Sequence, residues 1–338
     1  MTTIYLHVGM PKCASSTIQG YFNRFDERNR EAGFVYPVAG RSEGGYFNHE
    51  PIVHMDETQI AELVAKLKEE AEGAEVVFIS AEAFVNAYWD RPVTANLIDQ
   101  LSATFGAGNV RLLFLFRNHF SFIESAFAQF LKGGLYRVNH SKFYRKTDRD
   151  IESYCRAFRE VNDFDFYDYA RVIEGFRKHC KPENRIEVMS IERSDLETGD
   201  ILRELCNKFG LVPPGGRKVK NARFPVKALL GLAYAIEQRG FRSVRPYRKD
   251  IATHFADAVD GYSSKLHIHG AFAREVAERQ RADSVYFRTV LGCDCPALFE
   301  PRLDPPFPVS EENEVTLSSE DLAWLDGFFD TLEQPEQT

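Results

Sequence analysis

The N-terminal stretch that decides the fold reads Ile4-Tyr5-Leu6-His7-Val8-Gly9-Met10-Pro11-Lys12-Cys13-Ala14-Ser15-Ser16-Thr17. Its first five residues form an apolar run, which is typical of a buried strand. Apolar side chains then recur at helical spacing from Ile18 to Phe25. The stretch therefore predicts a strand, a tight loop and the start of a helix.

This loop has the features of an anion-binding site. The free N–H groups at a helix N-terminus and the positive end of the helix dipole point at one place. Three hydroxyl side chains and one ammonium group lie in the same stretch and add donors and charge. We expect it to bind phosphate or sulfate through Pro11, Lys12, Cys13, Ala14, Ser15, Ser16 and Thr17.

The position of the lysine separates this loop from that of nucleoside-triphosphate enzymes. Their pattern is G-x-x-x-x-G-K-[ST]. Aligned from Gly9, the second glycine falls on Ala14 and the lysine on Ser15, whereas the chain's own lysine is Lys12. This arrangement resembles the 5′-phosphosulfate loop of sulfotransferases that use 3′-phosphoadenosine 5′-phosphosulfate (PAPS). The family often has glycine at position 14, so the alanine predicts a loop that avoids positive φ there.

A second element supports the same resemblance. Residues 110–116 form an apolar run expected of a central parallel strand, and it ends at Arg117. A helical pattern follows, with Ser125 eight residues beyond the arginine. The resemblance implies that Arg117 and Ser125 bind the 3′-phosphate. A guanidinium suits this role because it binds phosphate in a bidentate manner. The alternative is a strand-end surface charge and an ordinary helix serine.

Glu82 is the predicted catalytic base. It follows a buried strand at residues 75–80, where the family places its base. A carboxylate can take the proton that an acceptor hydroxyl loses as it attacks sulfur. The alternative is that Glu82 is only the first residue of a helix, where its negative charge interacts favourably with the positive end of the helix dipole. His49, in a glycine-rich segment, is the rival base or a substrate contact; the alternative is an exposed loop residue.

The alternation of strands and helices predicts an α/β fold. Parallel strands are expected at 3–9, 75–80, 110–116 and 185–190. The expected helices lie near residues 15–30, 56–72, 93–105, 119–132, 150–160, 168–180 and 197–209. The central parallel sheet is expected to be flanked by helices. We expect a sulfotransferase domain at 1–300, with a helical, basic acceptor-side portion near 212–290, and then a linker and an acidic helix at 301–338.

Composition favours a soluble cytoplasmic protein. With 338 residues, 44% of them hydrophobic, the chain can bury a sizeable core. It has no run of 18 apolar residues, so no transmembrane segment is expected. Six scattered cysteines favour reduced thiols, and a strand that begins at residue 3 leaves no room for a signal peptide. Cys293 and Cys295 with His267 and His269 do not have zinc-site spacing, so no metal is expected.

The distribution of charge along the chain indicates which kinds of molecule it can bind. The chain has a net charge of −8, but the segment from Arg217 to Lys249 holds ten basic residues and one acid. Such a segment attracts anions, or its charges pair with acidic residues elsewhere in the chain. The predicted acceptor is a hydroxyl-bearing saccharide or other polar molecule, including anionic glycans, although the aromatic content also permits a phenol or a lipid. The overall acidity argues against nucleic acid.

The resemblance implies an enzyme that transfers a sulfuryl group from PAPS without a metal and releases 3′,5′-adenosine bisphosphate. Two other classes of protein stay open at this point. A P-loop-like small-molecule kinase would need a lysine after the loop and a carboxylate for Mg²⁺. A non-catalytic anion-binding protein on the same scaffold would be expected to lose Lys12, Arg117 or Glu82, and all three are present.

Overall fold

The computed structural model describes residues 1–43, 47–86, 92–135, 150–215, 224–258, 261–305 and 313–333. The chain forms two compact units, each built from three segments. The first unit holds Met1–His119, Asp168–Lys220 and Gln280–Glu300. The second holds Phe120–Tyr167, Asn221–Arg279 and Pro301–Thr338. The sequence predicted one domain up to residue 300, whereas the two units interleave along the chain before that point.

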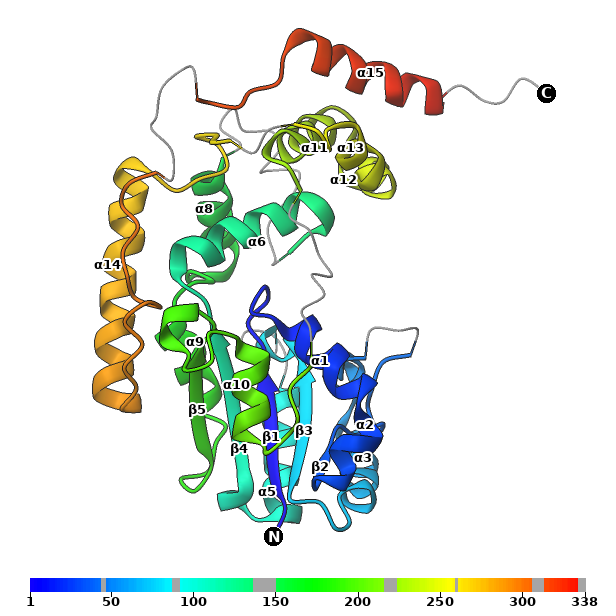
Figure 1. The fold of residues 1–338 in the computed structure, drawn as a ribbon, viewed down its shortest axis with the longest axis vertical. Helices are drawn as coiled ribbons and strands as arrows, with labels where there is room; N and C mark the ends of the chain where they lie inside the picture. The colour runs from blue at the N-terminus through cyan, green and yellow to red at the C-terminus, as the bar shows by residue number, and fades with distance from the viewer. Residues whose placement is uncertain are drawn as a thin grey trace, which may run out of the picture. The chain divides into compact units, whose positions relative to one another are not determined.

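The first unit is built on a five-stranded sheet in which every pair of neighbours is parallel. The strands are β1 (Thr3–Val8), β2 (Phe34–Val35), β3 (Val76–Ala81), β4 (Val110–Phe116) and β5 (Arg185–Ser190). Their order is β2-β3-β1-β4-β5, with β1 in the centre (Figure 1). The predicted α/β class and the four predicted strands are confirmed. The edge strand β2 was not predicted, because two residues leave no periodic pattern.

Helices cover both faces of this sheet. On one face Phe22 of α1 (Ser15–Arg24) contacts Phe78, and so does Phe209, which follows α10 (Ile201–Lys208). Side chains alternate along a strand, so His7 and Ser80 point to this same face. On the other face Phe176 of α9 (Tyr169–Arg177) contacts Phe114. That face is also covered by α3 (Glu57–Glu70) and α5 (Val93–Phe105).

The predicted helix at 15–30 consists of two helices. The first, α1, ends at Arg24, and α2 runs over Asp26–Glu31. The break falls at Phe25, whose N–H donates to the Tyr21 carbonyl. Shorter helical turns lie at η1 (Glu50–His54), η2 (Glu82–Asn86), η3 (Ala107–Asn109), η4 (Arg193–Asp195), η5 (Arg245–Tyr247) and η6 (Phe287–Leu291).

The second unit is helical. It contains α6 (His119–Gly133), α8 (Ile151–Asn162), α11 (Val226–Arg239), α12 (Phe241–Val244), α13 (Arg248–His254), the first part of α14 (Gly270–Tyr286) and α15 (Ser319–Glu333). Tyr154 of α8 packs between Phe127 and Phe130 of α6, which gives this unit an aromatic core of its own. The helices predicted near 119–132 and 150–160 are confirmed, and so is the acidic helix predicted within 301–338.

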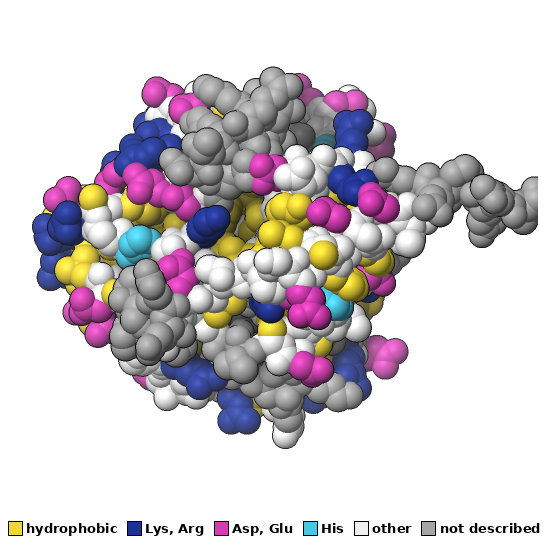
Figure 2. Space-filling model, turned by 90° about the horizontal axis from the view of Figure 1, so that it is seen from above, with side chains coloured by type: hydrophobic (Ala, Val, Ile, Leu, Met, Phe, Trp, Pro, Cys, Tyr) yellow, Lys and Arg dark blue, Asp and Glu magenta, His cyan; other side chains and the backbone are white. Residues whose placement is uncertain are grey.

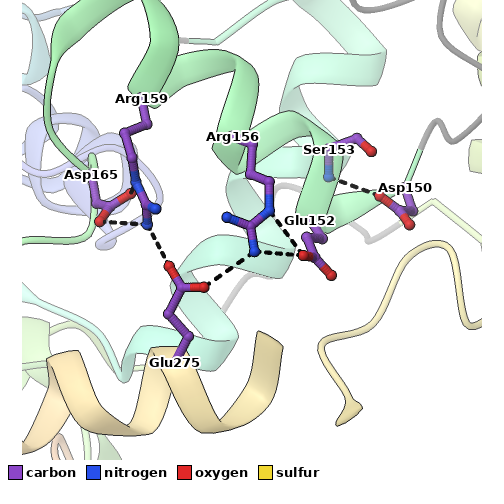
Figure 3. Close-up of polar contacts among 7 residues, drawn as sticks. All are labelled: Asp150, Glu152, Ser153, Arg156, Arg159, Asp165 and Glu275. Carbon is purple, nitrogen blue, oxygen red and sulfur yellow. Dashed lines mark hydrogen bonds and ion pairs between the residues drawn. The ribbon is translucent and has the colours of Figure 1, made fainter. Parts of the chain in front are cut away.

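A network of ion pairs joins α8 to α14 in this unit (Figure 3). The Glu275 Oε1 atom lies 2.6 Å from Arg159 Nη2, and its Oε2 atom lies 3.2 Å from Arg156 Nη2. Arg159 also pairs with Asp165, and Arg156 with Glu152 one helical turn away. The surrounding guanidinium groups hold the pKa of Glu275 below its usual value despite some burial. We interpret this network as structural, because each of its charges has a partner of opposite sign.

The acidic C-terminal helix pairs with basic residues of α11. Lys227 lies 2.8 Å from Asp321, and Arg239 pairs with Asp330. Two cations of the basic segment thus have acidic partners, and the first part of that segment lies outside the described residues. On the face drawn in Figure 2, basic and acidic side chains are interspersed.

Candidate functional site

Three of the predicted site residues come together at the carboxyl edge of the sheet. The loop that holds Lys12 follows β1, Glu82 follows β3 directly, and Arg117 follows β4 directly. After β1 the chain enters α1 on one face of the sheet, whereas α9, between β4 and β5, covers the other face. Ligands of open parallel sheets bind outside the carboxyl ends of such strands. The topology thus favours this edge as a ligand site.

The loop turns with two residues in left-handed conformation. Lys12 and Ala14 both have φ of +66°. The prediction that Ala14 avoids positive φ was wrong. Its carbonyl accepts from the N–H groups of Thr17 and Ile18, so this conformation is the one that starts α1. Left-handed turns beside right-handed residues direct successive N–H groups into a concave anion-binding nest.

The polar side chains of the loop divide into two groups. Ser16 and Thr17 are exposed at the start of α1, where their hydroxyls are open to a ligand. Ser15 is buried, and its hydroxyl faces the Glu82 carboxyl. Cys13 is fully buried, and burial raises the pKa of its thiol. We conclude that Cys13 packs in the core and that its contribution to a ligand site would come from its backbone.

Glu82 lies in the environment expected of a general base. Burial, the largest effect, raises its pKa above the ordinary value. The Ser15 hydroxyl, the Lys12 ammonium and the Lys12 backbone N–H act in the opposite direction, and the carboxylate of Glu50 acts with burial. A carboxyl whose pKa is raised toward neutrality binds a proton more strongly, which suits a base that must take one from a hydroxyl.

Lys12 is half-buried beside charges of both signs. Burial lowers the pKa of its ammonium group, the Glu82 carboxylate raises it, and Arg117 lowers it. The interaction with Arg117 places two cations and one carboxylate around the same loop. Because like charges repel, an anion bound between Lys12 and Arg117 would relieve their repulsion. This electrostatic pattern favours an anionic ligand.

The segment that carries Arg117 is held firmly. Its carbonyl accepts from the Tyr169 hydroxyl at 2.7 Å. The next residue, Asn118, is fully buried, and its side-chain amide donates to the carbonyls of Ala297, Leu298 and Glu300. Ser125 lies half-buried in α6, in the second unit. That Ser125 and Arg117 bind the same phosphate group stays a prediction.

His49 lies in the interior rather than in an exposed loop. Its side chain is fully buried, and Nε2 lies 3.1 Å from the Pro37 carbonyl. A carbonyl only accepts, so Nε2 carries the proton, and Nδ1 accepts from the Ser80 N–H at 3.2 Å. Burial lowers the pKa of this ring to about 4. With both nitrogens engaged, the geometry favours Glu82 over His49 as the base.

Sequence reasoning missed three polar residues beneath the loop. His7, Gln19 and Ser80 are buried and joined by hydrogen bonds through the Ser80 hydroxyl. The available signal was the presence of His7 and Ser80 inside two apolar strands. Polar residues at such positions are buried, and buried polar groups need partners.

In the described part of the chain, no group of three or more His, Cys, Asp or Glu side chains could hold a metal ion. Cys293 and Cys295 have sulfur atoms 3.4 Å apart. None of the helices in the described ranges combines the length and the apolar character needed to cross a bilayer.

Comparison with known proteins does not assign the chain to a family. No protein-family model, no curated protein and no solved structure matches the chain. The functional argument therefore rests on the geometry of the site and on the motifs that it contains.

The left-handed conformation of Ala14 leads to a stability prediction. Ala14→Gly should raise the free energy of unfolding by about 1 kcal/mol, because a Cβ disfavours this conformation by roughly that amount. Ala65→Gly, at an exposed position inside α3, is the matched control and should lower it by about 1 kcal/mol. Urea unfolding of both variants measures whether each substitution raises or lowers the free energy of unfolding. A loss of stability in Ala14→Gly would contradict the loop conformation.

Proposed function

We propose that the chain is a PAPS-dependent sulfotransferase. It moves a sulfuryl group from PAPS to an acceptor hydroxyl by in-line transfer and releases 3′,5′-adenosine bisphosphate. In this reaction the bond between sulfur and the bridging phosphate oxygen breaks, and a bond between sulfur and the acceptor oxygen forms. The bridging oxygen keeps the electron pair, and the acceptor proton passes to a base. No metal is required.

The proposal gives each group of the site a role. The 5′-phosphosulfate lies on the loop, where the N–H groups of α1 and the hydroxyls of Ser16 and Thr17 donate to it. Lys12 stabilises the charge that develops on the bridging oxygen. Glu82 takes the acceptor proton. Arg117 binds the 3′-phosphate, with Ser125 as its predicted second ligand.

One observation carries the proposal: Lys12, Glu82 and Arg117 interact electrostatically around a loop at the carboxyl edge of a parallel sheet. The cations suit a ligand with two anionic groups, and the carboxyl suits proton transfer. A phosphate-binding protein without catalysis has no need of a buried carboxyl beside its lysine. The observation therefore supports a transferase.

The acceptor is proposed only by class. It carries a hydroxyl that reaches Glu82, and we expect a saccharide or another polar molecule. The pairing of Lys227 and Arg239 with α15 removes those two residues from the argument for an anionic acceptor. The acceptor stays a saccharide or another polar molecule, with anionic glycans included, and a cytoplasmic location stays part of the proposal.

A screen of acceptors tests this function. The chain is incubated with PAPS labelled in its sulfate and with panels of neutral saccharides, anionic saccharides, phenols and lipid alcohols. Transfer of label to a hydroxyl compound, absent in Glu82→Gln, is the expected result. Transfer of phosphate from ATP to the same panels, with no sulfate transfer, would replace this proposal with a kinase.

Recognition of the 3′-phosphate yields a separate prediction. Arg117→Ala should weaken binding of 3′,5′-adenosine bisphosphate by about one to two decades in Kd, because a charge-assisted pair is lost. Adenosine 5′-phosphosulfate, which lacks the 3′-phosphate, should lose little. Calorimetric titration compares the two ligands, and Arg193→Ala, at an exposed arginine after β5, is the control. Equal weakening of both ligands would refute the assignment.

A further inference from the structure

Two cysteines in the last segment of the first unit have their sulfur atoms in contact. The Sγ atoms of Cys293 and Cys295 lie 3.4 Å apart and share a hydrogen bond. Cys293 is half-buried, whereas Cys295 is buried, with 7% of its surface exposed. This thiol pair therefore combines one sulfur that a reagent in solvent can reach with a second, protected sulfur beside it.

The backbone holds the thiol pair at both ends. The N–H of Cys293 donates to a carbonyl of η6 at 3.0 Å. Beyond the pair, the carboxylate of Asp195 accepts from the N–H groups of Ala297 and Leu298, each at 2.8 Å. Between these points, the backbone at the end of β5 makes a hydrogen bond with the Cys295 thiol. The two sulfur atoms are thus kept near each other by contacts with the rest of the first unit.

The contact between the sulfurs favours ionisation of the outer thiol. The hydrogen bond from Cys295 is the largest effect and lowers the pKa of the Cys293 thiol. Burial and the carboxylates of Asp294 and Asp195 act in the opposite direction, yet this pKa stays below its ordinary value. The pKa of Cys295 is raised, first by its hydrogen bond with Cys293 and then by burial. Since the thiolate is the nucleophile of thiol chemistry, Cys293 is the attacking sulfur.

Cys180 shows how an ordinary half-buried thiol of this chain differs. Its Sγ donates to the Phe176 carbonyl of α9 at 3.4 Å, and burial raises its pKa to about 11. A metal site does not explain the thiol pair either. Structural zinc takes four ligands, and no cluster of three or more His, Cys, Asp or Glu side chains suited to a metal occurs among the residues that the structure describes. The arrangement instead suits thiol–disulfide exchange.

We propose that Cys293 and Cys295 form a dithiol redox site that reacts with low-molecular-weight disulfides of the class R–S–S–R. The Cys293 thiolate attacks one sulfur of the reagent, forms a mixed disulfide and releases R–S⁻. The Cys295 thiol then loses its proton and attacks the Cys293 sulfur, which releases the second R–S⁻. The protein gives up two electrons and two protons as its S–S bond forms, and the reagent takes them up as two R–SH.

The second of these steps depends on proximity. Reacting atoms about 3–3.5 Å apart are well placed for reaction, and the 3.4 Å between the two sulfurs falls in this range. A disulfide bond is about 2.0 Å long, so the sulfurs approach further as it closes. The reaction needs neither PAPS nor an acceptor hydroxyl, so this inference goes beyond the proposed function and does not depend on it.

Disulfide mapping of the whole protein in mixtures of reduced and oxidised glutathione tests the inference. Free thiols are alkylated, the chain is digested, and the peptides are weighed by mass spectrometry. In oxidising mixtures the peptide with Cys293 and Cys295 should lose both alkylation sites without gaining glutathione, and dithiothreitol should restore both. Cys180 is the internal control. It should react with oxidised glutathione about tenfold more slowly or less, because the rate follows the thiolate fraction.

Two variants separate the roles of the sulfurs. Cys295→Ser keeps a hydroxyl that can donate to the thiolate but removes the second sulfur, so Cys293 should accumulate as a mixed disulfide with glutathione. Cys293→Ser leaves only the buried thiol of the pair, which should react about tenfold more slowly than Cys293 does in Cys295→Ser. Thermal unfolding verifies that each variant is folded.

Three results would overturn the inference. The first is the absence of a bond between Cys293 and Cys295 in an oxidising mixture that modifies Cys180. The second is a Cys293 thiol that reacts no faster than Cys180. The third is a Cys293→Ser variant that reacts as fast as Cys295→Ser, since Cys293 would then not be the attacking sulfur.

Discussion

Lys12→Ala should lower kcat by about a hundredfold or more, which is the usual effect of removing one group that stabilises developing charge in a transition state. Lys12 lies in the loop after β1, and its ammonium interacts with Glu82 and Arg117. In the proposed reaction it acts on the bridging oxygen, whose charge grows only as the sulfuryl group leaves. Turnover should therefore suffer more than nucleotide affinity.

Lys12→Met is the matched variant for this prediction. It keeps the length of the apolar stem and removes the charge, and neither substitution introduces a glycine at this position of positive φ. Both variants should lose similar amounts of kcat in a single-turnover assay with labelled PAPS. Near-normal turnover in either variant would remove Lys12 from the chemical step. A loss confined to Lys12→Ala would assign the effect to packing of the stem.

Glu82→Gln should lower kcat by about a hundredfold to ten-thousandfold, the range that a general base contributes. The substitution keeps the shape of the side chain and removes its basicity. Binding of 3′,5′-adenosine bisphosphate should remain, since the base acts on the acceptor. Glu50→Gln is the control, because it removes a neighbouring exposed carboxylate that interacts with Glu82.

His49→Asn tests the rival base. If it abolishes turnover while Glu82→Gln does not, the proton goes to His49 in spite of its burial. A loss below about tenfold in both variants would mean that neither residue is the base.

Glu82→Gln should also have a higher free energy of unfolding than the unsubstituted chain at neutral pH. Burial raises the Glu82 pKa above its ordinary value of 4.5. Below that value the carboxyl is protonated in the folded and the unfolded chain, so it costs nothing. As pH rises through 4.5, the unfolded chain ionises first, and stability falls until the raised pKa is passed. Thermal unfolding should therefore show a gain for Glu82→Gln at neutral pH that vanishes in acid.

Strands β1, β3 and β4 were predictable because each is a mostly apolar run, and β5 because Ile186 and Val188 alternate with polar residues. The loop after β1 was predictable because its residue types have a specific chemistry. Glu82 and Arg117 could be placed at the same edge of the sheet, since each directly follows a predicted strand. Their electrostatic contact with Lys12 follows from that parallel arrangement.

Other features depend on tertiary structure that local patterns do not contain. Ala14 adopts positive φ because the start of α1 requires it, which outweighs its local preference. His49 is buried because the Pro37 carbonyl and the Ser80 backbone supply its partners, and these come from distant segments. The interleaved units and the Ser80 hydrogen-bonded group are formed by residues far apart in the chain, so neither leaves a periodic signal.

Binding of 3′,5′-adenosine bisphosphate in the presence of a metal chelator tests the central claim most directly, because it needs no knowledge of the acceptor. The account predicts calorimetric binding without Mg²⁺, a large loss of affinity in Arg117→Ala, and no comparable binding of ATP under the same conditions. Binding of ATP only when Mg²⁺ is present, with no binding of the bisphosphate, would contradict it.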